Sequence, residues 1–170
     1  MLVVAIALLA GLWLALLLAA PALPAPLSAA VYAFGSLICH QQPERSFHLA
    51  AFQLPVCARC FGIYAGAAAG TLAAAWLRPK TTGPNGGTRR RMARVLATRR
   101  WSVTLAAGVP TMATFALEWI GAWQPSNATR ALAGVPLGFA VALVLMRATV
   151  HYGECAPRRP IAPSPPPPSI

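Results

Sequence analysis

Long apolar stretches constrain the fold of this chain more than any other feature of its sequence. Residues 2–20 form an unbroken apolar run, close to the ~20 residues that a membrane-spanning helix needs. Three further apolar stretches of similar length follow, at 56–77, 101–123 and 128–150. Only 10% of the residues are charged, whereas an ordinary soluble domain has about 25%. The sequence therefore predicts an all-α fold, a polytopic membrane helix bundle of about four transmembrane helices.

The remaining segments complete a single transmembrane helical domain over residues 1–150. Residues 28–38 are apolar but too short to span, so they predict an interfacial or re-entrant helix at the outer face. The proline-rich end, 151–170, cannot form a core and predicts a disordered tail. A cleaved signal over residues 1–22 is the alternative to a first spanning helix, because Ala20-Pro-Ala22 resembles a cleavage site. The long apolar run, with no basic segment before it, favours a retained helix.

Positive charge is concentrated between the second and third apolar stretches. The net charge is +11, and eight of the fourteen Lys and Arg residues lie in the segment 78–100. The positive-inside rule places such a loop in the cytoplasm, where it can also attract anionic lipid headgroups. This placement predicts a multi-pass protein of the plasma membrane with both termini in the cytoplasm. A nucleic-acid partner is not expected, because no separate folded module presents the charge.

Glycines repeat at four-residue intervals in two of the apolar stretches. Gly62, Gly66 and Gly70 fall on one face of the second predicted span. Gly134 and Gly138 share a face of the fourth. Small residues at this spacing let the backbone of a neighbouring helix approach closely. We expect helices to pack through these faces, which could also support oligomerisation.

Cysteine and histidine residues occur where the apolar stretches break into polar sequence. Cys39 and His40 follow the short apolar segment, and Cys57 and Cys60 lie at the start of the second predicted span. Because thiols, imidazoles and guanidinium groups are costly beside lipid, polar groups at this depth indicate function. The predicted topology puts these four residues at the outer face and puts Cys155 on the cytoplasmic side.

Two chemistries fit this outer-face cluster. Thiolates with a nearby imidazole can bind zinc or copper in a tetrahedral set. The candidate ligands are Cys39, His40, Cys57 and Cys60. Adjacent residues could hardly both reach one ion from a regular helix, so His48 is a rival to His40. Alternatively, Cys57 and Cys60 form a CxxC pair at the positive end of a helix, which suits thiol–disulfide exchange.

The same topology brings charged residues to that face. Arg59 lies in the first turn of the second span, and Arg130 lies in the first turn of the fourth. Glu118 lies seventeen residues along the third span, about 25 Å at ~1.5 Å per residue, and so reaches the same level. We predict a polar network here, either an ion-paired cluster that fixes helix register or a pocket for an anionic headgroup or substrate. Its members are Glu44, Arg45, Arg59, Glu118, Asn127 and Arg130.

Strings around these residues resemble the signature of a known family. They are Cys39-His-Gln-Gln-Pro-Glu-Arg-Ser-Phe47, Pro55-Val-Cys-Ala-Arg-Cys-Phe-Gly-Ile-Tyr-Ala-Gly66 and Asn127-Ala-Thr-Arg130. The family is the domain of unknown function 2085, a group of small bacterial and archaeal membrane proteins. The composition, rich in Ala, Arg and Pro, fits a bacterial member. The resemblance implies a membrane protein with its motif at the outer face, and it supplies no activity. Glu118 stands where an aspartate is expected in that family.

Three functional hypotheses follow from these patterns. The first is an integral membrane protein with an outer-face Cys/His site that binds zinc or copper. The alternative is a membrane thiol–disulfide oxidoreductase that uses Cys57 and Cys60, with Cys39 as a partner thiol. A second alternative is a Cys/His enzyme that acts on an anionic lipid. The sequence thus leaves open whether the chain is an enzyme.

Overall fold

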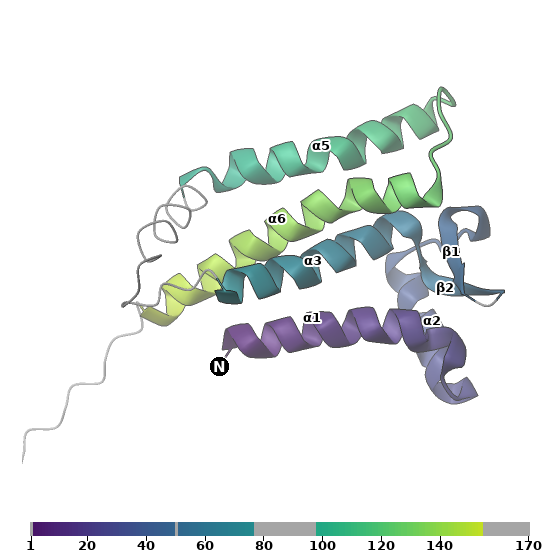
Figure 1. The fold of residues 1–170 in the computed structure, drawn as a ribbon, viewed down its shortest axis with the longest axis horizontal. Coiled ribbons are helices and arrows are strands. Elements are labelled where there is room, and N and C mark those ends of the chain that lie inside the picture. The colour runs from purple at the N-terminus through teal and green to yellow at the C-terminus, as the bar shows by residue number, and fades with distance from the viewer. Residues whose placement is uncertain (1, 50, 77–97, 155–170) are drawn as a thin grey trace, which may run out of the picture.

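The computed structural model describes residues 2–49, 51–76 and 98–154 (Figure 1). Within these residues the chain is mostly helical, as the apolar stretches predict. Most of the predicted basic loop, Cys155 and the rest of the predicted tail lie outside the described residues. In chain order, with η for a 3-10 turn, the elements are α1 (Leu2–Ala19), η1 (Ala20–Ala22), α2 (Ala25–Ile38), η2 (Pro43–Arg45), β1 (Ser46–Leu49), β2 (Phe52–Cys57), α3 (Ala58–Trp76), α5 (Arg100–Trp119) and α6 (Asn127–Glu154).

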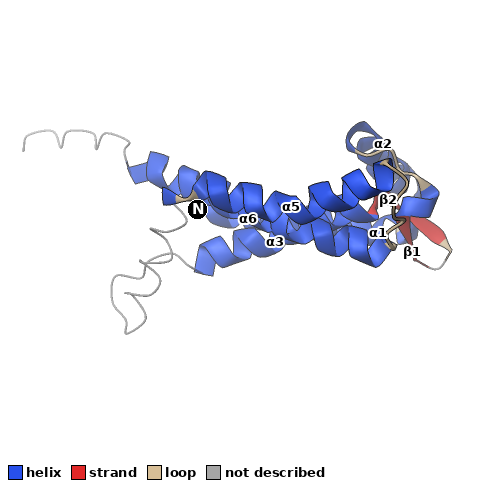
Figure 2. Ribbon diagram, turned by 90° about the horizontal axis from the view of Figure 1, so that it is seen from above, coloured by secondary structure: helices blue, strands red, loops and turns tan. Residues whose placement is uncertain are grey.

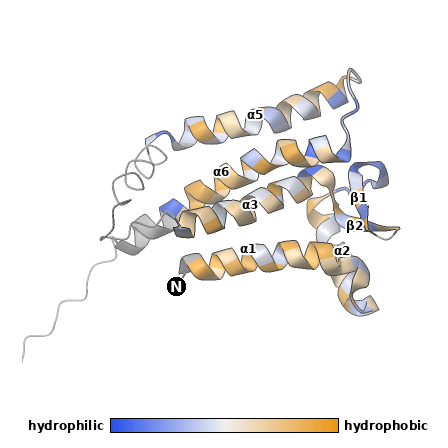
Figure 3. Cartoon of the chain, viewed as in Figure 1, coloured by the Kyte–Doolittle hydropathy of each residue, from blue (hydrophilic) through white to orange (hydrophobic). Residues whose placement is uncertain are grey.

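The four long helices form a single layer in the order α5, α6, α3 and α1 (Figure 1). Helix α6 packs against both α3 and α5, and α1 packs against α3. The view at right angles shows the same helices within one narrow band (Figure 2). Hydrophobic residues cover most of the helices, and hydrophilic residues lie mainly towards the two ends of the layer (Figure 3). Large apolar side chains are exposed along the layer, which fits helices that face lipid; they include Leu8, Leu72, Leu105 and Leu132.

In the part of the chain that the structure describes, two helical segments are long and apolar enough to cross a membrane, Val4–Ala22 and Asn127–Arg147. A signal sequence would pass the same test as the first of them, because it lies near the N-terminus. Helices α3 and α5 form where the second and third spans are predicted. Among the described residues they do not meet the criterion, because glycine and polar residues lower their mean hydropathy. All four predicted spans are therefore helices, and two of them are candidate spans.

A two-stranded antiparallel sheet corrects the prediction of an all-α fold. Strands β1 and β2 pair with Ser46 opposite Cys57, and the chain reverses at Ala51, whose φ of 71° lies in the left-handed region. The segment between α2 and α3 thus contains a hairpin. Because β2 extends through Cys57, α3 begins at Ala58, later than the predicted start at 56.

Other boundaries differ at the ends of helices. Helix α5 ends at Trp119 instead of 123, and Gly121 follows with a φ of 72°, the left-handed conformation that commonly ends a helix. Helix α6 continues to Glu154, so residues 151–154, predicted as part of the disordered tail, are helical. The short apolar helix predicted at 28–38 is present as α2, and its interfacial or re-entrant placement stays a prediction.

The glycine faces bring α3 and α6 into backbone contact, as predicted. A Cβ at Gly62 or Gly66 would overlap the backbone of α6 at Ala131 or Val135. In the reverse direction, a Cβ at Gly138 would overlap a carbonyl oxygen of α3. Because this contact lies within one chain, it positions the first turns of α3 and α6 beside each other. Oligomerisation through such faces stays a prediction.

Candidate functional site

Three cysteines from different elements meet at the end of the layer that carries the hairpin. Cys39 directly follows α2, Cys57 is the last residue of β2, and Cys60 lies in the first turn of α3. Their Sγ atoms all lie within 4.8 Å of one another, and all three are free thiols. The predicted placement of Cys57 in the first turn of the helix is wrong, because the strand ends there. The predicted thiol cluster nevertheless forms.

The end of α2 is held against β2, which brings the first cysteine to the other two. Gly35 allows this contact, because a Cβ there would overlap the Pro55 carbonyl oxygen. The Gln41 side chain donates hydrogen bonds to the carbonyl oxygens of Tyr32 and Pro55, at 2.8 and 2.7 Å. Gln41 itself has a φ of 50°, which non-glycine residues seldom adopt. Its side-chain hydrogen bonds therefore stabilise the turn that positions the Cys39 thiol.

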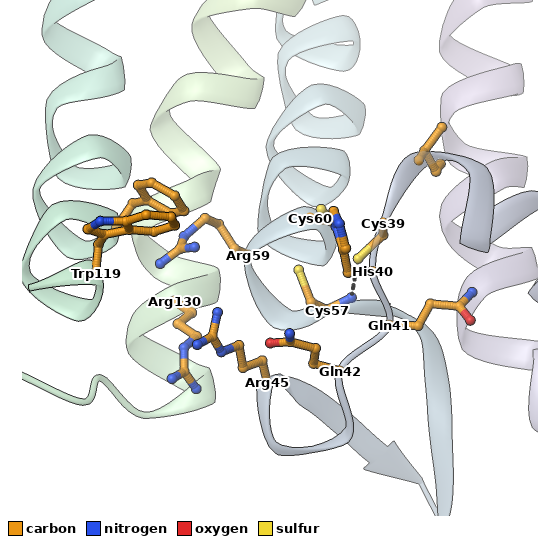
Figure 4. Close-up of a pocket in the computed structure, with 12 residues that line it drawn as sticks. Cys39, His40, Gln41, Gln42, Arg45, Cys57, Arg59, Cys60, Trp119 and Arg130 are labelled. Atoms are coloured by element: carbon orange, nitrogen blue, oxygen red, sulfur yellow. Dashed lines mark hydrogen bonds between the residues drawn. The ribbon is translucent and has the colours of Figure 1, made fainter. Parts of the chain in front are cut away.

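Hydrogen bonds at Cys57 favour the thiolate form of that residue. The backbone N–H of Cys57 donates to Cys39 Sγ at 3.1 Å (Figure 4). A hydrogen bond with the Cys60 thiol lowers the pKa of the Cys57 thiol to about 5, although burial opposes this change. Cys57 is therefore a thiolate at neutral pH. The thiolate is the form that binds metal ions and attacks disulfides.

The two candidate histidines lie differently with respect to the thiols. His40 is exposed and lines the same cavity as the three cysteines, whereas His48 lies exposed on β1 outside that lining. Neither imidazole is within the group that the sulfur atoms form. Adjacent residues in a regular helix were not expected to reach one ion together. This does not exclude Cys39 and His40 as joint ligands, because α2 ends at Ile38 and the backbone at Cys39 is extended.

A buried carboxylate joins most of the polar residues predicted for this face. The Glu118 side chain is 3% exposed and accepts hydrogen bonds or ion pairs from three guanidinium groups. Its Oε1 lies 3.0 Å from Arg45 Nε and 2.9 Å from Arg130 Nη2, and its Oε2 lies 3.0 Å from Arg59 Nη2. The Arg59 guanidinium also lies over the Phe115 ring, at 5.4 Å. One carboxylate thus links η2, α3 and α6 to α5.

Asn127 extends this network to the hairpin. Its Nδ2 donates to the Ser46 carbonyl oxygen at 2.9 Å, and its Oδ1 accepts from Arg130 Nη1 at 2.8 Å. Glu44, which was predicted to belong to the network, lies exposed in η2 and forms no ion pair with the described residues. The structure therefore brings five of the six predicted polar residues together.

The thiols and the arginines line two sides of one cavity of about 370 Å³ (Figure 4). Ile38 from α2, together with Phe115 and Trp119 from α5, adds apolar surface to its lining. Small-molecule pockets commonly measure about 300–1,000 Å³. The cavity is therefore large enough for a small ligand, and it presents sulfur ligands and positive charge to the same space.

Several residues of the site escape sequence reasoning. Gln53 Nε2 donates to the Gln41 carbonyl oxygen, so two glutamines hold the turn after α2. Gln41 and Gln42 lie inside the string that resembles the family signature, and this position was the one indication in the sequence that they belong to the site. Trp119 lies near the end of a predicted span, where an aromatic belt accounts for it without a cavity.

Comparison with known proteins bears on the membrane assignment. The family model described as "Predicted membrane protein (DUF2085)" matches residues 39–144. An uncharacterized protein of Methanocaldococcus jannaschii is 29% identical over 120 residues, which are 71% of this chain and 69% of that protein. An uncharacterized protein of Methanothermobacter thermautotrophicus is 32% identical over 107 residues, 63% of this chain and 83% of that protein. Both relatives are archaeal and lend no support to a bacterial source. No solved structure matches the chain.

Proposed function

Because the chain belongs to the DUF2085 family of predicted membrane proteins, we propose that it is an integral membrane protein that binds one transition-metal ion through Cys39, Cys57 and Cys60. One observation carries this proposal: three Sγ atoms from separate elements lie within 4.8 Å of one another. Tetrahedral zinc with Zn–S bonds of about 2.3 Å requires sulfur atoms about 3.8 Å apart. Shifts of about 1 Å would therefore close the three thiols on an ion.

The electrostatics of the cluster support metal binding. Metal ligands must be thiolates, and the pKa of Cys57, about 5, supplies one at neutral pH. The backbone N–H group of Cys57 donates to Cys39 Sγ and so fixes the position of a second sulfur atom. Arg59, which lines the same cavity, offsets part of the negative charge of a metal held by three thiolates.

A fourth ligand is available in the same cavity. His40 lines it and is better placed for this role than His48 on β1. Zinc with three cysteines and one histidine is a common structural set, and a water molecule in the fourth position makes an open site. Copper(I) also prefers thiolate ligands. We therefore propose zinc or copper and leave the choice to measurement.

We further propose that the chain is a multi-pass protein of the plasma membrane, with the site at the outer face. Helices α3 and α5 then complete four spans with α1 and α6. In support, the start of α1, the ends of α3 and α6 and the start of α5 lie at one end of the layer, opposite the hairpin (Figure 1). The positive-inside rule then puts both termini in the cytoplasm with the basic segment 78–100, which faces anionic lipid headgroups.

Thiol labelling in intact cells tests this orientation. A membrane-impermeant maleimide should label a variant that retains only Cys57, because that thiol is at the outer face. A variant that retains only Cys155 should be labelled only after the membrane is permeabilised. The reverse pattern would contradict the proposed topology without bearing on metal binding.

Elemental analysis of the purified chain tests the metal site. We expect about one zinc or copper ion per chain in detergent-purified protein, together with fewer titratable thiols than the four cysteines provide. Cys57→Ser should abolish the bound metal, and Cys155→Ser is the matched control that should retain it. Metal-free protein with all thiols titratable, or equal metal loss in both variants, would refute the proposal.

A thiol–disulfide oxidoreductase is the second candidate, favoured by the hydrogen bond with Cys60 that lowers the pKa of Cys57. In such a reaction the Cys57 thiolate attacks a partner disulfide, and the other partner sulfur leaves as a thiolate. The Cys60 thiolate then attacks the Cys57 sulfur of the mixed disulfide, which forms a Cys57–Cys60 disulfide and releases the second partner sulfur as a thiolate, so that the chain is oxidised and the partner reduced. A Cys60→Ala variant should accumulate the mixed disulfide on non-reducing electrophoresis. Stoichiometric metal without any such adduct would count against this candidate.

A further inference from the structure

Positive charge exceeds negative charge on the arginine side of the cavity. Three guanidinium groups meet one carboxylate, that of Glu118. The whole chain has only three acidic residues. Glu44 is exposed, and Glu154 ends α6, about 40 Å along the helix from its start at ~1.5 Å per residue. Among the described residues, no carboxylate other than Glu118 forms an ion pair with these guanidinium groups.

Two of the three guanidinium groups are largely buried, which makes their charge costly without a partner. Arg130 is 6% exposed, and the side chain of Arg59 is 15% exposed. The buried Nε atoms of both residues have no hydrogen-bond partner in the part of the chain that the structure describes. Zinc held by three thiolates would add one net negative charge, and so would a Cys57 thiolate alone. Neither would balance the two positive charges that remain after Glu118.

We propose that the cavity binds a phosphate group, free or as part of a lipid headgroup, on the guanidinium groups of Arg45, Arg59 and Arg130. Phosphate supplies the missing negative charge and several oxygen acceptors, and it matches the planar fork of arginine. The proposal goes beyond the metal site and rests on the arginines and the cavity alone.

The shape of the cavity leaves the arginines accessible to such a ligand. Glu118 is not among the residues that line the cavity, so it lies behind the guanidinium groups and orients them. The volume of about 370 Å³ exceeds what a phosphate ion fills and leaves room for an attached group. Phe115 and Trp119 would contact that group, and tryptophan is enriched at the level of lipid headgroups.

The test uses the full chain in detergent, stripped of metal with a chelator and then desalted, so that the result does not depend on the metal site. In one arm, inorganic phosphate is titrated and the heat is measured. In the other, native mass spectrometry counts the phosphatidylglycerol retained from mixed micelles with phosphatidylcholine. Saturable phosphate binding would identify a free anion, and preferential retention of phosphatidylglycerol would identify a headgroup. The absence of both would overturn the proposal.

Substitutions of single arginines locate the binding. Arg59→Gln should lower the affinity for the ligand about tenfold or more, which is the loss expected for one charge-assisted hydrogen bond. Arg45→Gln should do the same, and its side chain, 43% exposed, tolerates substitution even where Arg59→Gln unfolds the protein. Arg99→Gln is the matched control, because it removes one charge from an exposed residue at the opposite end of α5. Equal weakening by Arg99→Gln and Arg45→Gln would show attraction to net charge alone and overturn the proposed site.

Discussion

Replacing Glu118 by glutamine removes the carboxylate at which three guanidinium groups meet and preserves the size of the side chain. The new amide N–H groups would also face arginine N–H groups, donor against donor. The side chains of Arg59 and Arg130 are 15% and 8% exposed, so solvent screens their ion pairs little. The pair with Arg45, 43% exposed, adds at most about 1 kcal/mol.

Loss of one partner from a buried ion pair costs about 3–5 kcal/mol, because the remaining charge is left without compensation. We therefore expect Glu118→Gln to lower the free energy of unfolding by about 3–5 kcal/mol. Denaturant unfolding in detergent micelles, followed by circular dichroism, measures this change. Glu44→Gln is the matched control at an exposed residue and should change stability by less than about 0.5 kcal/mol. A loss below about 1 kcal/mol for Glu118→Gln would refute the inference that the network binds the helices together.

Three further predictions concern helix packing and the thiols. Gly66→Ala should lower the free energy of unfolding by about 1–3 kcal/mol, because the new methyl group would overlap the backbone of α6. Gly11→Ala, in open space on α1, is the control and should raise the free energy of unfolding by up to ~1 kcal/mol. Equal effects of the two substitutions in thermal unfolding would contradict the packing. In metal-free protein, alkylation of Cys57 by iodoacetamide should become faster as the pH rises through about 5 and then level off, because the thiolate is the reactive form. Cys60→Ala should move this midpoint up towards the ordinary value of about 8.5, and a midpoint already there in the unaltered chain would contradict the hydrogen bond. Gln41→Ala should retain the helical circular dichroism spectrum and weaken metal binding about tenfold, because the turn loses both side-chain hydrogen bonds; unchanged affinity would show that the turn does not position the thiols.

The helices were predictable because a long apolar run has few other structures available to it. The sheet was not predictable, since its two strands are short and Pro55, a residue that disfavours strands, stands inside the second. Hydropathy also does not indicate which helices are neighbours, so it could not predict that the helices form one layer. The glycine repeats gave the one packing contact that the sequence could specify, because a face without Cβ atoms has a definite steric consequence.

The polar network was predictable from distance along the helices. The rise per residue places Glu118 at the level of Arg59 and Arg130 once the topology is assumed, and the structure joins these three side chains. The approach of Cys39 to Cys57 was harder to predict, because it depends on how α2 packs against β2. That contact needs a glycine in α2 and a left-handed glutamine, and neither follows from the spacing of the cysteines.

The backbone contact between α3 and α6 has a mechanical meaning for the site. Glycines on each helix lie against carbonyl groups of the other, so a slide of either helix would drive a Cβ into backbone. The pair can separate but cannot slip, and it holds Arg59 and Arg130 at a fixed spacing. Cys39 reaches the site from α2, which packs mainly on β2 and η1. A ligand in the cavity would therefore meet two guanidinium groups whose spacing the α3–α6 contact sets.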